Sequence, residues 1–168
     1  MATAMIVDAL FSLVSSFPPW LATIVLSALP VTEAQLAIPV AIVSWKLHPA
    51  QVYALAMFGN ALPIVPIFFG FTALRAWAER YAQWSVKWLD RLVARAHRKF
   101  GSDFEKYGVL GLIAFMAIPF PGTGVWTAVL AAVALKLPWK QAIPAILCGM
   151  FLVGAIVVGL TMSGLAVT

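Results

Sequence analysis

Two long apolar stretches, residues 50–73 and 139–162, constrain this chain more than any other feature. A helix needs about 20 residues to cross the hydrocarbon of a bilayer, so each stretch is long enough to span it. Pro63 and Pro66 predict kinks in the first span. Only 10% of the residues are charged, against about 25% in soluble domains. We therefore expect an all-α integral membrane protein that forms a single domain over residues 1–168.

Shorter apolar runs occur in two pairs, and each pair surrounds a polar break. The four runs cover residues 20–29, 34–45, 107–118 and 125–135. The breaks are LPVTEAQ at 29–35 and PFPGTG at 119–124. At about 1.5 Å of rise per residue, each run crosses roughly half a bilayer. Non-helical backbone at membrane depth is tolerated only where protein buries it or water reaches it, so each pair predicts a re-entrant helical hairpin.

The pattern of one hairpin followed by one span occurs twice. The repeats cover about 18–73 and 107–162, and four residues recur after the same shift: Lys46, Leu47, Gln51 and Gly59 match Lys136, Leu137, Gln141 and Gly149. A single span separates the two hairpins, so they should enter the membrane from opposite faces. Inverted repeats of broken helices are typical of transporters, with the binding site near the midplane.

The segment between the repeats, about 74–100, is basic and rich in tryptophan. Its large apolar residues recur at steps of three and four: Leu74, Trp77, Tyr81, Trp84, Trp88 and Leu92. This spacing predicts an amphipathic helix on the membrane surface, with Arg91, Arg95 and Arg98 facing anionic lipid, rather than a nucleic-acid site. On this topology every Lys and Arg except Lys46 lies on one side, which the positive-inside rule makes cytoplasmic. Both termini would then face outward.

Both breaks also resemble a known family. LPVTEAQLAIP (29–39) and IPFPGTGVWTAVLAA (118–132) are similar to the bacterial family described as small multi-drug export proteins, over nearly the whole chain. The architecture also resembles the DedA superfamily, although residues 115–124 lack an arginine, which argues against direct phosphate binding there. The resemblance implies an inner-membrane transporter that exports or translocates a small amphiphilic molecule or a lipid carrier.

Glu33 is the one acidic residue of the apolar part besides Asp8. An ionisable side chain inside a membrane is costly and suggests function, here exchange of a proton for a cationic or amphiphilic substrate. A structural interpretation is also open. Thr32 and Gln35 match a capping box as N-cap and N3, and Glu33 at N1 would be stabilised by the helix dipole.

The second break provides the other half of the predicted site. Gly122, Thr123 and Gly124 precede a helix whose free N–H groups favour an anion, whereas Glu33 favours a cation, and a protonated Glu33 would reconcile the two. The glycines alternatively permit a tight turn. Trp126 either packs in the core or stacks on substrate. Four prolines are expected to shape the breaks: Pro30, Pro39, Pro119 and Pro121.

Signals of enzymatic chemistry are absent from the sequence. His48 and His97 lack nearby metal-ligand partners, and Cys148, the single cysteine, is expected to pack as a small hydrophobe. We therefore predict no catalytic residue, metal, cofactor or nucleic-acid partner. The expected partners are membrane lipid, the amphiphilic substrate and a second copy of the chain, since two spans make a thin wall. The alternative is a non-transporting scaffold that binds anionic lipid or a partner through its basic helix; the polar breaks favour transport.

Overall fold

The computed structural model describes residues 16–81, 104–120 and 123–167, and the regular structure within these ranges is α-helical. The helices are α2 (Pro19–Ala28), α3 (Glu33–Val43), α4 (Pro49–Ala61), α5 (Ile64–Tyr81), α7 (Phe104–Ala117), α8 (Val125–Ala134) and α9 (Trp139–Val167). Two stretches are long and apolar enough to cross a membrane, Pro49–Trp77 and Trp139–Gly164. The all-helical fold and the short helices on either side of both breaks are therefore confirmed.

Proline determines where several of these helices begin and end. Pro19 occupies the first turn of α2, where a missing N–H is not needed. Leu29 after α2 is extended, as expected for a residue that precedes a proline. Pro30 and Pro119 lie in the breaks between helices. These two prolines therefore shape the breaks as predicted, while Pro121 lies outside the described residues.

Pro39 is different, because it lies inside α3 and does not break it. A proline at this position removes one intrahelical hydrogen bond, the one to the carbonyl of Gln35. The helix continues because its neighbours Ala37, Ile38 and Ala41 are almost completely buried against other helices. The prediction that Pro39 shapes the break was wrong, since Pro39 lies within α3 and tertiary packing compensates for one lost bond.

The first span contains one interruption rather than two kinks. α4 ends at Ala61 and α5 begins at Ile64, so the helix is interrupted at Leu62 and Pro63. Pro66 lies in the first turn of α5, where its ring and missing N–H are tolerated. Only Pro63 therefore interrupts the span.

The predicted surface helix does not start at Leu74, because α5 continues without a break to Tyr81. Leu74, Trp77 and Tyr81 are exposed along α5, and the Trp77 and Tyr81 rings lie 5.4 Å apart. Arg75 is only half-buried and turns toward α8. Residues 82–100, with Arg91, Arg95 and Arg98, lie outside the described residues.

Each hairpin packs against the long helix that follows it. The most extensive helix contacts are those of α2 with α4 and of α7 with α9, while α3 crosses to α9 and α8 crosses to α5. Gly59 permits the first contact, since a Cβ there would overlap the Ile24 backbone of α2. Gly149 permits the second, since a Cβ there would overlap Met116 of α7. Small residues at helix interfaces allow membrane helices to approach each other closely.

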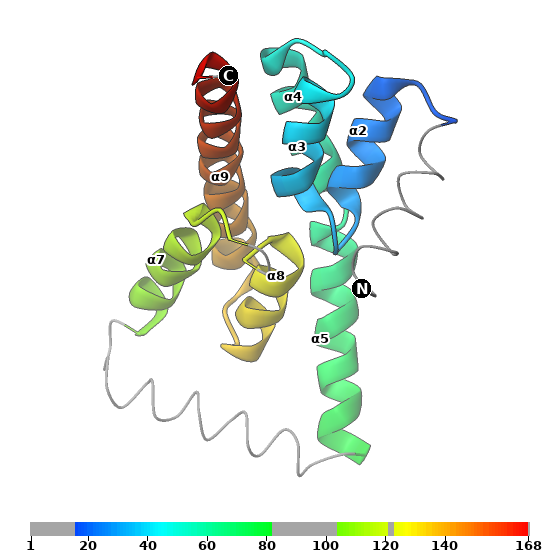
Figure 1. Cartoon of the computed structure of the whole chain (residues 1–168). Helices are drawn as coiled ribbons and strands as arrows, with labels where there is room; N and C mark the ends of the chain where they lie inside the picture. Colours follow the sequence, from blue (N-terminus) through cyan, green and yellow to red (C-terminus); the bar gives the residue numbers. More distant parts are fainter. Residues whose placement is uncertain (1–15, 82–103, 121–122, 168) are drawn as a thin grey trace, which may run out of the picture.

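Figure 1 shows α2, α3 and α4 in the upper part of the molecule and α5, α7 and α8 in the lower part. The breaks of the two hairpins meet between these parts. α3 runs upward from its break and α8 runs downward from its own. The two helices therefore begin close to each other and run in opposite directions (Figure 1).

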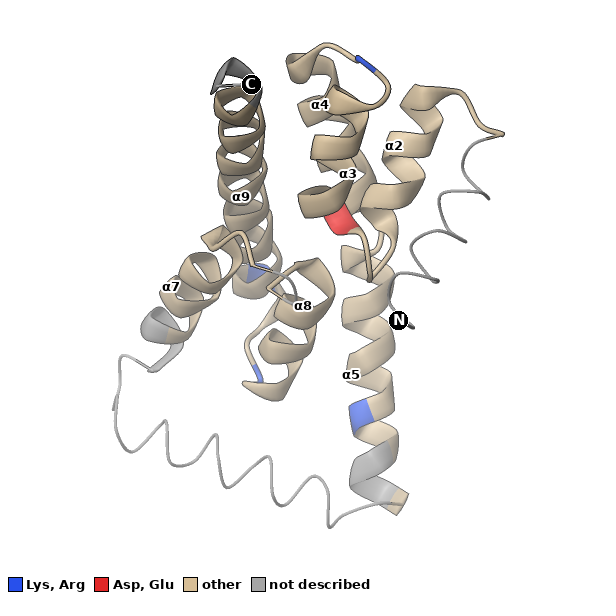
Figure 2. Ribbon diagram, viewed as in Figure 1, with Lys and Arg blue, Asp and Glu red and all other residues tan. Residues whose placement is uncertain are grey.

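Charged side chains are separated along the molecule. Figure 2 shows basic residues in the loop after α3 at one end, and on α5, after α8 and near the start of α9 toward the other. These are Lys46 at the first end and Arg75, Lys136 and Lys140 at the second. The acidic residue drawn at the start of α3 lies between the two groups (Figure 2).

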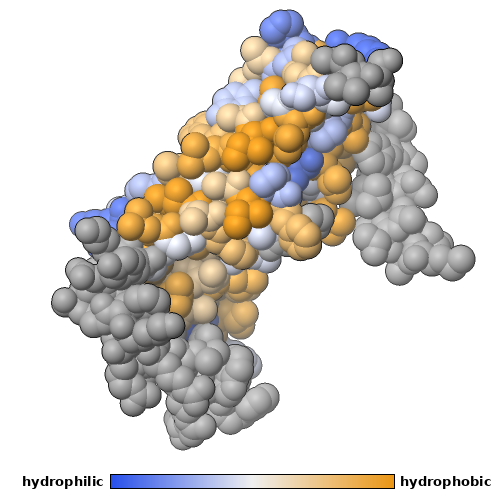
Figure 3. Space-filling view, turned by 60° about the vertical axis from the view of Figure 1, so that its left-hand side comes forward, coloured by the Kyte–Doolittle hydropathy of each residue, from blue (hydrophilic) through white to orange (hydrophobic). Residues whose placement is uncertain are grey.

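The surface between these ends is largely hydrophobic, with a small hydrophilic patch within it (Figure 3). Phe58, Phe69 and Leu160 are each more than half exposed, at 60%, 51% and 61%. Cys148 is also exposed on α9, so its predicted packing in the interior was wrong. In a spanning helix the lipid-facing side is as apolar as the core side, and the sequence does not distinguish the two.

Candidate functional site

Glu33 lies where the two breaks meet. It is the first residue of α3 and is only 7% exposed. Its Oε1 atom accepts a hydrogen bond, 3.5 Å long, from the backbone N–H of Trp126, the second residue of α8. A carboxylate at a helix N-terminus is stabilised by the helix dipole. Here the N-terminus of α8, in the other hairpin, also faces the carboxylate. The dipole of α8 therefore adds to that of α3.

The predicted capping box at the start of α3 does not form. Thr32 is at the N-cap position, but its side chain makes no capping hydrogen bond there. Its hydroxyl donates instead to the carbonyl of Leu26 in α2. Gln35 has a buried amide nitrogen without a hydrogen-bond partner. Thr32 does not cap α3 because its own backbone is helical, with φ −96° and ψ −45°, whereas an N-cap residue has an extended backbone.

Gly124 is required by this arrangement for a reason that neither sequence interpretation gave. Its backbone is extended, with φ −90°, so no tight-turn conformation demands glycine. A Cβ at Gly124 would overlap the carboxylate of Glu33. The missing side chain of Gly124 therefore makes room for the Glu33 carboxylate at the N-terminus of α8.

The backbone of Glu33 is strained. Its φ of 45° lies in the left-handed region, which costs roughly 1–2 kcal/mol for a residue with a Cβ. Its N–H donates to the carbonyl of Leu29 at 3.0 Å, which closes the turn of the first break. Strain of this kind persists where the surrounding structure demands it, and it often marks functional sites.

The other predicted residues of the second hairpin, Trp126 and Thr123, make structural hydrogen bonds. The indole N–H of Trp126 donates to the carbonyl of Ala28 in α2 at 3.2 Å, so Trp126 links the hairpins at two points. The Thr123 hydroxyl lies 2.7 Å from the carbonyl oxygens of Ile118 and Phe120 and closes its own loop. Gly122 lies outside the described residues.

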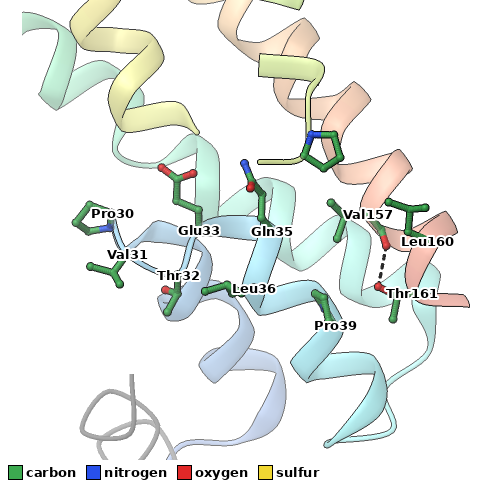
Figure 4. A pocket seen from close by; sticks show the side chains of 11 residues that line it. Pro30, Val31, Thr32, Glu33, Gln35, Leu36, Pro39, Val157, Leu160 and Thr161 are labelled. Atoms are coloured by element: carbon green, nitrogen blue, oxygen red, sulfur yellow. Dashed lines mark hydrogen bonds between the residues drawn. The ribbon is translucent and has the colours of Figure 1, made fainter. Parts of the chain in front are cut away.

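A cavity of about 450 Å³ opens beside Glu33. Its lining combines the first break, α3, the second break and α9: Pro30, Val31, Thr32, Glu33, Gln35, Leu36, Pro39, Pro119, Val157, Leu160 and Thr161. In Figure 4 the Glu33 carboxylate and the Gln35 amide point the same way, into the space below α8 and the second break. The structure thus brings six predicted residues together in one cavity, and Gly124 and Trp126 contact Glu33 directly.

Three lining residues, Val157, Leu160 and Thr161, come from α9 and were not predicted. Their segment of the sequence is largely apolar, and the Thr161 hydroxyl donates within its own helix to the Val157 carbonyl at 2.7 Å (Figure 4). The crossing of α3 over α9 brings them to the site. No local sequence signal identifies such residues.

The lining suits a small amphiphile. Glu33 and Gln35 provide polar groups, and Val31, Leu36 and Leu160 provide hydrocarbon surface. Binding sites for small molecules are commonly apolar with a few polar groups that fix orientation. Across residues 16–81, 104–120 and 123–167, no three His, Cys, Asp or Glu side chains are grouped so as to hold a metal ion.

Fold and site together are those of a helical membrane protein with a largely apolar cavity that contains a buried carboxylate. A family model described as "Putative small multi-drug export protein" matches residues 33–156, which include Glu33, the second break and most of α9. The chain belongs to this family, as residues 29–39 and 118–132 predicted. No curated protein and no solved structure matches the chain.

Proposed function

We propose that this protein is a transporter of the bacterial inner membrane that exports or translocates a small amphiphilic molecule or a lipid carrier through the Glu33 cavity. The family description supports export of small molecules. The observation that supports the site is the buried Glu33 carboxylate, which lines the cavity and also accepts a hydrogen bond from α8. Export needs no chemical reaction, so we assign no catalytic residue.

The transport model rests on an inverted repeat of two re-entrant hairpins, over 18–73 and 107–162. Matching features of the two units support it. Lys46 and Lys136 both have left-handed backbones, with φ of 54° and 56°. At both Gly59 and Gly149, the first helix of the preceding hairpin packs closely against the backbone of the glycine. In transporters built this way, the repeats move relative to each other around a central site.

Glu33 would couple movement to binding because the strength of its hydrogen bond to α8 depends on the charge of its carboxylate. An ionised Glu33 accepts the Trp126 N–H and so holds the tips of the hairpins together. A proton or a cationic substrate on the carboxylate would weaken that bond and release the N-terminus of α8. A ligand shifts a conformational equilibrium only through such a difference in affinity between states.

For the orientation, we propose that the end with Arg75, Lys136 and Lys140 faces the cytoplasm and that both termini face outward. The positive-inside rule supports this choice. We also propose a homodimer, because the two candidate spans of the described residues would form only a thin wall around a transport path.

Glu33→Gln tests the proposed function. The full chain is reconstituted into vesicles, and proton-driven flux of tetraphenylphosphonium and of a polyprenyl-phosphate analogue is measured together with thermal stability. Gln keeps the size and most hydrogen bonds of Glu33 but cannot release a proton. We expect a folded protein whose flux no longer depends on the pH gradient.

Thr123→Val is the control, because it removes the loop hydrogen bonds of the second break without altering a charge. It should lower stability while leaving the pH dependence of flux. Retained proton-driven flux in Glu33→Gln would refute coupling through this residue. Absence of flux in the unmodified protein, with binding to anionic vesicles, would favour the scaffold.

A further inference from the structure

The rim of the Glu33 cavity is apolar. The exposed residues of its lining are Pro30, Val31, Leu36, Pro119 and Leu160. Val31, Leu36 and Leu160 are 47%, 45% and 61% exposed, whereas Glu33 is 7% exposed. A surface that faces water is covered mostly by polar residues, and exposed apolar side chains that gather in one place mark a contact with lipid or protein. The opening therefore faces hydrocarbon rather than water.

The rim continues into exposed apolar stripes on two helices. On α9, Leu152, Ile156 and Leu160 recur at steps of four and are all exposed, so they lie on one face of the helix. On α3, Leu36 and Val43 are both exposed and lie two turns apart on one face. α3 packs against α9, and both stripes end at the cavity. A molecule dissolved in the hydrocarbon would therefore reach the cavity without leaving apolar surroundings.

The charge of the cavity disfavours anions. Among the described residues of the lining, Glu33 is the one acid and none is Lys, Arg or His. Free N–H groups at the start of α8 would favour an anion, but the Glu33 carboxylate already occupies that position. It accepts the Trp126 N–H and fills the space that a Cβ at Gly124 would need. An anionic head group would have to displace this carboxylate and remain buried near it without a cation, whereas an ammonium group would gain a charged partner.

We propose that the substrates of this cavity are apolar amines with one positive charge, and that they enter laterally from the hydrocarbon between α3 and α9. The ammonium group pairs with Glu33, and the hydrocarbon part lies along Leu36 and Leu160, which determine access. This substrate class rests on the proposed function of the same cavity, and it excludes anionic lipid carriers.

Two photoactivatable probes with the same dodecyl chain test the substrate class. One has an ammonium head group and the other a phosphate, and each carries a diazirine in the middle of its chain. The full chain in phosphatidylcholine nanodiscs is crosslinked to each probe, and the labelled segments are mapped by mass spectrometry. We expect the ammonium probe to label 31–36 and 156–161 saturably, and Glu33→Gln to lower this labelling about tenfold because the charged partner is lost. The phosphate probe should label these segments weakly.

Leu36→Trp tests the lateral route, and Val43→Trp is its matched control. Both residues are exposed on the same face of α3, but Val43 does not line the cavity. An indole at position 36 would overfill the opening, so labelling by the ammonium probe should fall about tenfold. Val43→Trp should be labelled like the unmodified chain.

Equal or stronger labelling by the phosphate probe, or equal labelling of the two Trp variants, would overturn the proposal. The comparison of the two probes uses the unmodified chain, so it holds even if a variant fails to fold. Flux is measured separately in reconstituted vesicles. Saturable, Glu33-dependent labelling by the ammonium probe without flux would refute transport and support this assignment of the site. Flux without such labelling would support transport and refute the assignment.

Discussion

Glu33 is placed by three other residues. Leu29 accepts its backbone N–H, Trp126 donates to its carboxylate, and Gly124 leaves space for that carboxylate. The left-handed backbone of Glu33 is maintained against its strain by these contacts. The geometry of the site therefore depends on residues from both breaks. A substitution at Gly124 should displace the Glu33 carboxylate.

Gly124→Ala should destabilise the protein by about 1–3 kcal/mol, because its Cβ would overlap the Glu33 carboxylate. The same substitution in a Glu33→Ala background should cost less, since the overlapping atoms are gone. Unfolding of the four proteins in detergent gives the coupling energy, which we expect to be about 0.5–3 kcal/mol. Additive effects of the two substitutions would show that Gly124 has another role, such as a requirement of the loop itself.

Among the elements, the contacts of α2 with α4 and of α7 with α9 each include one glycine at which the helices lie closest to overlap. Gly59 faces backbone atoms of Ile24, which cannot move aside as a flexible side chain can. Gly149 faces the Cβ of Met116 and lies near the Ile113 carbonyl, so its partner is equally close to the main chain. Each hairpin therefore depends on one small residue of the following long helix for its position.

Gly59→Ala and Gly149→Ala should each lower stability by about 1–3 kcal/mol, because overpacking forces the helices apart. The controls are Gly70→Ala on α5 and Gly159→Ala on α9, where an added Cβ meets nothing within 4 Å. These controls should be neutral or gain up to about 1 kcal/mol from the better helix propensity of alanine. Unfolding by titration with SDS measures all four. Similar effects at all four positions would contradict a packing role for Gly59 and Gly149.

At the scale of the whole molecule, the described basic residues form two groups of unequal size at opposite ends. Lys46 is alone at one end, and Arg75, Lys136 and Lys140 gather at the other (Figure 2). The apolar surface between them fits the hydrocarbon of a membrane (Figure 3). The unequal charge predicts a fixed orientation.

Cysteine labelling tests this orientation in a Cys148→Ser background, which removes the native thiol. Ser44→Cys, next to Lys46, should react with a membrane-impermeant thiol reagent in intact cells. Lys140→Cys should react only after the membrane is permeabilised, and Arg75 and Lys136 remain to preserve the charge difference. Labelling of Lys140→Cys from outside would reverse the proposed topology.

The sequence by itself determined the four half-length helices, the two long apolar stretches and the two breaks. Apolar runs of two lengths separated spans from half-length helices, and Pro30, Pro63 and Pro119 marked interruptions, because backbone constraints at proline act locally. Glu33 was identified for a similar reason, since an acid within an apolar segment is recognisable without knowing its neighbours.

Tertiary structure alone decided what each of these residues contacts. Thr32 bonds to Leu26 rather than capping α3, Glu33 reaches α8 rather than only its own helix, and Pro39 is tolerated inside a packed helix. Val157 and Thr161 join the site because α3 crosses α9. In each case a partner distant in the sequence competes with the local one, and the choice depends on how closely the helices pack. That distance is set at glycines such as Gly59, Gly124 and Gly149, whose missing side chains matter only once the opposing helix is in place.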